Sequence, residues 1–122
     1  NNRERTMPPP WDDAVPVINE AIARVHAGGG TVVVGTDAGI HGLKPHDVLP
    51  FALPTLLDAG MSTVQALRAI TSAAADVCRT PDRGRLAAGL PADIVAVDGD
   101  PTVEPEALVR VTSVWKDGRR VR

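Results

Sequence analysis

The stretch Thr31-Val32-Val33-Val34-Gly35-Thr36-Asp37-Ala38-Gly39 decides the fold class of this 122-residue chain. Its first four residues are β-branched and show no alternation of apolar with polar side chains, which is typical of a strand covered on both faces, in a parallel sheet or barrel. A glycine-rich turn with Asp37 at its centre follows directly. The stretch therefore predicts a buried strand over residues 31–35 in an α/β protein.

A helix is predicted before this strand. Asp12 or Asp13 fits the N-cap, and Pro16 is tolerated in a first turn. The apolar residues that recur at helical spacing are Val15, Ile18, Ile22 and Val25. The glycines at 28–30 are suited to ending the helix. A helix, a glycine turn and a strand in this order are typical of an α/β protein.

Further helices are predicted after a loop over residues 36–47. One runs through residues 53–59 and is closed by Gly60. Prolines stand at 50 and 54, and because both cannot lie harmlessly in one first turn, we expect a kink or a late start. Ser62 and Gln65 fit a capping box that begins the next helix. The apolar face of that helix is predicted to consist of Val64, Leu67 and Ile70.

A short helix capped by Ser72 is expected to run through Cys78, which this interpretation makes a small core residue. After residue 79 short segments separated by glycine and proline replace the helical pattern. Strands are predicted at residues 94–97 and 111–116, with Asp117-Gly118 as a hairpin turn. We therefore divide the chain into an α/β part, residues 1–78, and a small β part, residues 79–122. The acidic residues Asp93, Asp98 and Asp100 are interpreted as turn residues, not a cation site.

Composition excludes several classes of function. Charged residues make up 23% of the chain, the formal net charge is -2, and aromatic residues make up only 2%. A nucleic-acid binder would need a basic surface or aromatic side chains for stacking, and a polybasic membrane anchor would need a cationic cluster. No apolar run approaches the roughly 20 residues of a membrane span. The single cysteine cannot form an internal disulfide, so the simplest location is the cytoplasm.

Asp37 is the residue best placed for chemistry. A carboxylate just past the carboxyl end of a parallel strand lies where α/β folds and barrels carry reactive groups, and it can bind a metal ion or accept a proton from water. The alternative is that Asp37 only caps a turn. His41 and His46 share its loop, and a self-contained metal site of these three residues stays open. We favour histidines that are exposed or lie at the mouth of a pocket.

Five stretches in this order make the chain similar to the C-terminal end of amidohydrolases of the imidazolonepropionase-like and prolidase-like branch. The stretches are TVVVGTDAG at residues 31–39, LDAGMSTVQALRAITS at 57–72, GRLAAG at 84–89, PADIVAVDGDP at 91–101 and VWKDGR at 114–119. The resemblance covers roughly residues 17 to 122. It departs from the family at Ala73-Ala74-Ala75, where relatives often have Asn-Pro-Ala.

The resemblance implies a fold and a mechanism. Residues 31–35 would be the last strand of a (β/α)8 barrel, and residues 79–122 would supply the C-terminal strands of a composite β-sandwich. One or two divalent metal ions, zinc in many relatives, would hold a hydroxide that attacks an amide, imide or ring-amide C–N group. Asp37 matches the residue that contacts the metal and acts as general base and then general acid.

The family's other metal ligands precede this region and have no counterpart in the 122 residues. We therefore expect a C-terminal segment of a metal-dependent amidohydrolase that acts on a small or dipeptide-like substrate, with the missing N-terminal part of the barrel as its partner. The isolated chain would be inactive. The competing interpretation is a truncated, non-catalytic remnant or interaction module. Whether the protein forms oligomers stays open.

Overall fold

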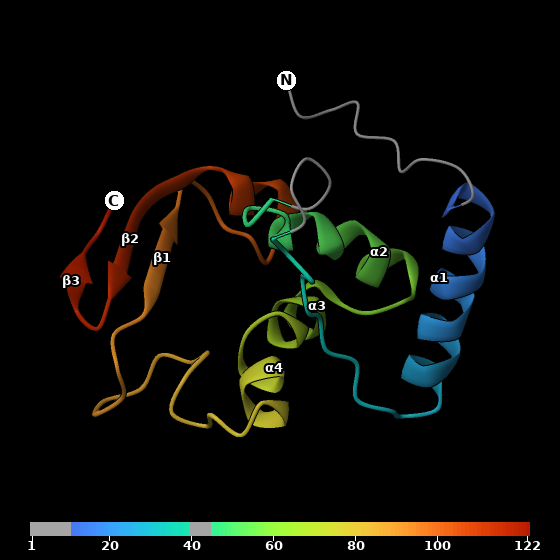
Figure 1. The fold of residues 1–122 in the computed structure, drawn as a ribbon, viewed down its shortest axis with the longest axis horizontal. Coiled ribbons are helices and arrows are strands. Elements are labelled where there is room, and N and C mark those ends of the chain that lie inside the picture. The colour runs from blue at the N-terminus through green and yellow to red at the C-terminus, as the bar shows by residue number, and fades with distance from the viewer. Residues whose placement is uncertain (1–10, 40–44) are drawn as a thin grey trace.

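The computed structural model describes the backbone of residues 11–39 and 45–122, and the side chains of these residues except 11–13. The described elements are α1 (Trp11–Ala27), η1 (Leu49–Ala52), α2 (Leu53–Asp58), α3 (Thr63–Ala69), α4 (Ser72–Val77), β1 (Ile94–Val97), η2 (Pro105–Val109), β2 (Val111–Lys116) and β3 (Arg119–Arg120). Figure 1 shows the sheet at one end, α1 at the other, and α2 to α4 between them. The chain is thus a mixed α/β structure, as the sequence predicts.

Helix α1 begins earlier than the sequence predicts. It starts at Trp11, so Pro16 lies inside the helix and not in its first turn. The C-terminal end is as predicted, because Gly29 adopts a φ of 77° and its N–H donates to the carbonyl of His26. Along the helix, Val17, Ile18 and Val25 are each about half exposed or more. The apolar stripe of α1 is therefore only partly covered by the rest of the described chain.

The two prolines at 50 and 54 are accommodated by two successive short helices. Pro50 lies in the first turn of η1, and Pro54 in the first turn of α2. Each proline stands where a backbone N–H would lack a partner. Gly60, with φ 87°, follows α2 as predicted.

Helices α3 and α4 differ in how they start. Ser62 and Gln65 form the predicted capping box of α3: the Ser62 hydroxyl accepts from the Gln65 N–H, and the Gln65 side chain accepts from the Ser62 N–H. The prediction that Ser72 caps α4 is wrong. Thr71 occupies the cap position without a side-chain capping bond, because its hydroxyl donates to the carbonyl of Leu67 in the preceding helix.

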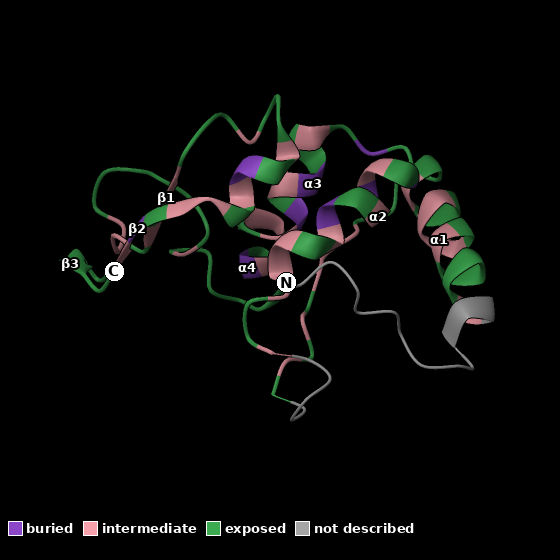
Figure 2. Cartoon of the chain, turned by 90° about the horizontal axis from the view of Figure 1, so that it is seen from above, coloured by how far each residue is buried: buried purple, intermediate pink, exposed green. Residues whose placement is uncertain are grey.

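A small core lies among α2 and α3. Its buried members are Leu53, Leu56, Met61, Ala66 and Ala69, with Ile22, Val32, Val34, Leu57, Leu67, Ile70 and Leu108 packed around them. The buried line of α3 therefore runs through its alanines, whereas Val64, predicted to face the core, is 48% exposed. Figure 2 shows most of the buried segments on α2, α3 and α4, in the middle of the molecule.

The predicted strand over residues 31–35 is wrong for this chain. Residues 31–35 lack regular structure, and Val32, Val33 and Val34 are only half-buried. Among the described residues, a single backbone hydrogen bond holds residues 31–34, from the N–H of Val34 to the carbonyl of Ala69 at 3.1 Å. A strand exists only when a neighbour completes its ladder, and the described residues supply no second segment beside this one.

The C-terminal half forms an antiparallel sheet in the order β1-β2-β3. The strands at residues 94–97 and 111–116 match the prediction, and a bulge lies between Ala96 and Val97. Asp117 and Gly118 both have positive φ, 48° and 77°, as the two-residue turn of a tight hairpin requires. The domain boundary at residue 79 and the membership of this sheet in a composite sandwich remain predictions.

Candidate active-site loop

Asp37 lies at the centre of a sharply turned loop. It has a φ of 48°, and Gly39 has a φ of 110°, which an L side chain rarely adopts. The Thr36 hydroxyl accepts a hydrogen bond from the Ala38 N–H at 3.2 Å and stabilises the turn. Aspartate tolerates the left-handed conformation better than most residues. The sequence Gly35–Gly39 thus builds a backbone turn whose central carboxylate-bearing residue is exposed.

His46 comes close to this loop. A Cβ built on Gly39 would lie 3.9 Å from the Cε1 atom of His46, so the imidazole stands beside the Gly39 backbone. The residue is exposed, and its position at the mouth of a pocket stays a prediction. Its role in binding stays a prediction. His41, the other histidine predicted there, lies outside the described residues.

A complete metal centre is not formed by the residues that the structure describes. Among them, no group of three His, Cys, Asp or Glu side chains is arranged to hold a metal ion. Catalytic zinc sites commonly use three protein ligands and one water. A site of this kind would therefore need ligands beyond the described part of the loop.

Two other predictions for polar residues have different outcomes. Asp100 is a turn residue, as predicted: its Oδ1 accepts from the N–H and the hydroxyl of Thr102 at 2.8 and 2.6 Å. These bonds hold the pKa of Asp100 below its ordinary value. Cys78 is exposed, so its predicted place in the core is wrong. The reason is that α4 ends at Val77 and buries Ala75, which leaves Cys78 beyond the covered face.

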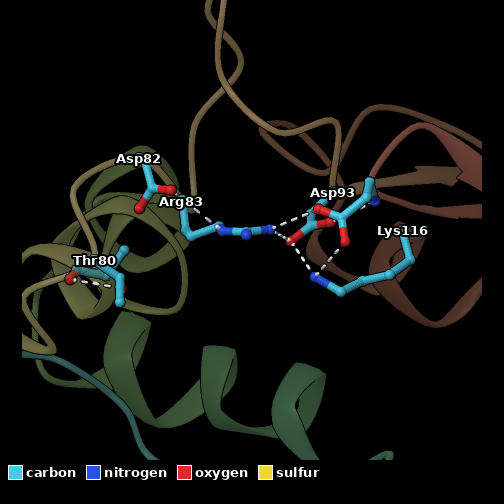
Figure 3. Close-up of polar contacts among 7 residues, drawn as sticks. Thr80, Asp82, Arg83, Asp93 and Lys116 are labelled. Atoms are coloured by element: carbon cyan, nitrogen blue, oxygen red, sulfur yellow. Dashed lines mark hydrogen bonds and ion pairs between the residues drawn. The ribbon is translucent and has the colours of Figure 1, made fainter.

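A cluster of charges at the start of β1 was not predicted from the sequence (Figure 3). Asp93 accepts hydrogen bonds from the Arg83 guanidinium at 2.6 Å, the Lys116 ammonium at 2.8 Å and the Asp117 N–H at 2.9 Å. The Lys116 bond and then the Asp117 N–H lower the pKa of Asp93 well below its usual range. The cluster ties the loop before β1 to the β2–β3 hairpin. The register could have revealed part of it, because pairing Ile94 with Trp115 sets Asp93 opposite Lys116.

The sequence of this chain matches one protein family over nearly its whole length. The model of the amidohydrolase family matches residues 3–122. The chain belongs to the amidohydrolase family. No curated protein sequence is similar enough to count as a relative of this amidohydrolase chain.

Solved structures place the chain near prolidase-like members of the family. A Xaa-Pro dipeptidase with methionine bound in its active site is 28% identical, with a TM-score of 0.79 over 88% of this chain and 26% of its own. A candidate prolidase from Bifidobacterium longum is 27% identical, with a TM-score of 0.78 over 85% of this chain and 26% of its own. The ochratoxinase of A. niger is 28% identical, with a TM-score of 0.67 over 85% of this chain and 24% of its own. The resemblance inferred from the five sequence stretches is thereby confirmed.

The amidohydrolase chain spans about a quarter of the length of these solved structures. Within residues 11–39 and 45–122, no helix has the length and apolar character needed to cross a membrane.

Proposed function

We propose that this chain is the C-terminal segment of a metal-dependent amidohydrolase that hydrolyses a non-ester C–N bond in a small or dipeptide-like substrate. The observation that carries the proposal is the Gly35–Gly39 loop with Asp37 at its centre, in a chain that matches the amidohydrolase family. Similarity to a Xaa-Pro dipeptidase and to ochratoxinase supports an amide-type bond as the target.

Asp37 has the chemistry for the proton transfers of such a hydrolysis. A carboxylate accepts a proton from the water that attacks the carbonyl carbon. The same group, now protonated, donates that proton to the departing nitrogen, so that the C–N bond breaks to give an acid and an amine. The turn presents the Asp37 side chain at the surface of the loop, where a bound substrate could reach it.

A divalent ion, zinc in the simplest case, would polarise the scissile carbonyl and make water a better nucleophile. Asp37 would be the ligand from this chain, and the remaining ligands would come from elsewhere in a longer protein. His46 and His41 would lie at the mouth of the same pocket and contact the substrate. If an alanine substitution of either histidine left KM unchanged, that histidine would have no role in substrate binding.

The partner for this segment is the preceding part of the barrel. A hollow of about 410 Å³ runs between α1 and residues 31–33. It is lined by Ile18, Ala21, Ile22, Val25, Thr31, Val32 and Val33, none of which is charged. Next to it, the backbone groups of residues 31–33 make no backbone hydrogen bond within the described chain. An added β-strand fits here, because its side chains would cover the apolar groove and its backbone would pair with these backbone groups.

The test is Asp37→Asn in the longer protein that carries this segment. Asparagine keeps the size and turn preference of aspartate but cannot accept the proton, so we expect kcat to fall at least about a thousandfold while the thermal midpoint changes little. Asp58→Asn is the matched control, because Asp58 is an exposed carboxylate on α2. Unchanged turnover in Asp37→Asn would remove the catalytic assignment.

The alternative is a non-catalytic remnant or an interaction module. It is favoured by the incomplete ligand set among the described residues. The two proposals separate when the missing portion is supplied on a second chain. Recovery of hydrolysis that Asp37→Asn abolishes supports the enzyme, whereas binding without hydrolysis supports the module.

A further inference from the structure

A second hollow, of about 330 Å³, lies where the C-terminal end of α1 meets α3 and α4. None of residues 35–39 lines it, and neither does His46, so it is separate from the candidate active-site loop. Its volume is near the lower end of the range for small-molecule sites, about 300–1,000 Å³. The hollow therefore has room for a small ligand and is not used by the proposed hydrolysis.

The polar lining of this hollow includes hydrogen-bond donors and no carboxylate. His26 and Arg68 line it, and no aspartate or glutamate does. Within the described part of the chain Arg68 makes no ion pair, whereas Arg24, Arg83, Arg85 and Arg110 each pair with a carboxylate. A guanidinium with no acidic neighbour, facing a concave surface, is suited to a planar anion that accepts two hydrogen bonds.

Gln65 adds a donor whose direction is set by the start of α3. Its Oε1 accepts from the Ser62 N–H at 2.8 Å in the capping box, so its side-chain NH2 group points away from that bond. An amide nitrogen donates and does not accept. Gln65, like Arg68, lines the hollow, and both side chains therefore favour an acceptor-only group such as a carboxylate.

The rest of the lining is largely apolar. Val32, Met61 and Ala73 contribute to it from three separate segments, and Met61 is buried. A fully hydrated phosphate or sulfate would gain little from such a wall, whereas a short aliphatic group would gain from leaving water. The ligand that fits both sides has a carboxylate at one end and a few apolar carbons at the other.

We propose that this hollow, with Arg68 as its anchoring cation, is a binding site for a small aliphatic carboxylate. The same chemistry has two possible sources. One is a free molecule of amino-acid size, and the other is an aspartate or glutamate side chain in the remainder of a longer protein. The site does not depend on Asp37, so its failure and the failure of the proposed hydrolysis can be told apart.

The experiment is a titration of the ¹⁵N-labelled 122-residue chain with isobutyrate, followed by NMR at the Arg68 side chain and the backbone amides of Ala69 and Ala73. We expect saturable shifts, with isobutyramide and inorganic phosphate binding at least tenfold more weakly. Arg68→Gln should weaken isobutyrate binding at least tenfold. The matched control Arg119→Gln removes an exposed arginine of β3 and should leave binding unchanged.

A second variant distinguishes loss of the binding site from loss of the fold. Ala73→Leu keeps all charges and fills the apolar wall, and it should also abolish the shifts. The proposal is overturned if isobutyrate causes no shifts in the unchanged chain, or if Arg68→Gln and Ala73→Leu show shifts as strong as those of the unchanged chain. Tighter binding of phosphate than of isobutyrate would also overturn it. Binding to the short chain but not to the longer protein would assign the site to an internal carboxylate, and binding to both would assign it to a free ligand.

Discussion

Asp93 shows how a partly exposed carboxylate can organise a loop. It receives hydrogen bonds from Arg83 and, at the β2–β3 hairpin, from Lys116 and the backbone of Asp117, so that two separate segments meet at one carboxylate. Because these partners lower its folded-state pKa, the carboxylate stabilises the fold above its unfolded-state pKa of about 4 and loses that contribution as the pH falls below this value. The cluster should therefore make the β part sensitive to acid.

We predict that Asp93→Asn lowers the urea midpoint of unfolding at pH 7, and that the difference from the unchanged chain shrinks steadily between pH 4 and pH 2. The effect should be modest and weaker in 1 M salt, because 31% of the Asp93 side chain is exposed. Asp98→Asn is the control, since that side chain accepts no hydrogen bond from the described residues and its replacement should lower the midpoint less. If the difference in urea midpoint between Asp93→Asn and the unchanged chain were the same at all pH values, the Asp93 carboxylate would not be the source of the acid sensitivity.

At the scale of elements, the starts of α3 and α4 offer a paired comparison. Ser62 makes both bonds of a capping box, whereas Ser72 is already the first residue of its helix and caps nothing. We predict that Ser62→Ala lowers the free energy of unfolding by about 1 kcal/mol and that Ser72→Ala changes it by less than about half of that. Chemical denaturation of both variants measures this. Equal losses would show that the bonds of the Ser62 cap contribute nothing specific.

The elements that were predicted correctly are those whose cause is local. The capping box and the Asp117-Gly118 hairpin depend on neighbours a few residues away, and the strands at residues 94–97 and 111–116 find each other within the same C-terminal half of the chain. The cap of α4 failed because the Thr71 hydroxyl donates to a carbonyl of the preceding helix. The strand at residues 31–35 failed because a strand needs a partner that the local pattern cannot supply.

In the candidate site, too, the features with a local cause could be predicted and those that depend on distant residues could not. Asp37 could be singled out because a carboxylate between glycines after an apolar run has a local signature, and the structure places it in a left-handed turn. The metal ligands that would complete the site could not be found, because they are not grouped among the described residues. Cys78 was assigned to the core from its apolar neighbours alone, and the exposed end of α4 could not be read from that pattern.

At the scale of the whole molecule, the described chain covers its apolar surface unevenly. Among the larger side chains of the described residues, Leu53 and Leu56 are almost completely buried, and the core is built mostly around α2 and α3. Within the described residues, the groove between α1 and residues 31–33 is open, with half-buried valines and backbone groups that lack a backbone partner along one side. Such an edge favours association through added strands.

We predict that the 122-residue chain without a partner self-associates as its concentration rises, and that Val33→Lys shifts it toward the monomer. A lysine at this edge places a charge in the groove and repels a second strand, and Val33 is exposed enough to accept the change without loss of the core. Sedimentation velocity at several concentrations measures the distribution. Val103→Lys is the control, because Val103 is 81% exposed and lies far along the chain from the groove. A chain that stays monomeric throughout, or one whose association Val33→Lys leaves intact, would show that this groove is not where the partner docks.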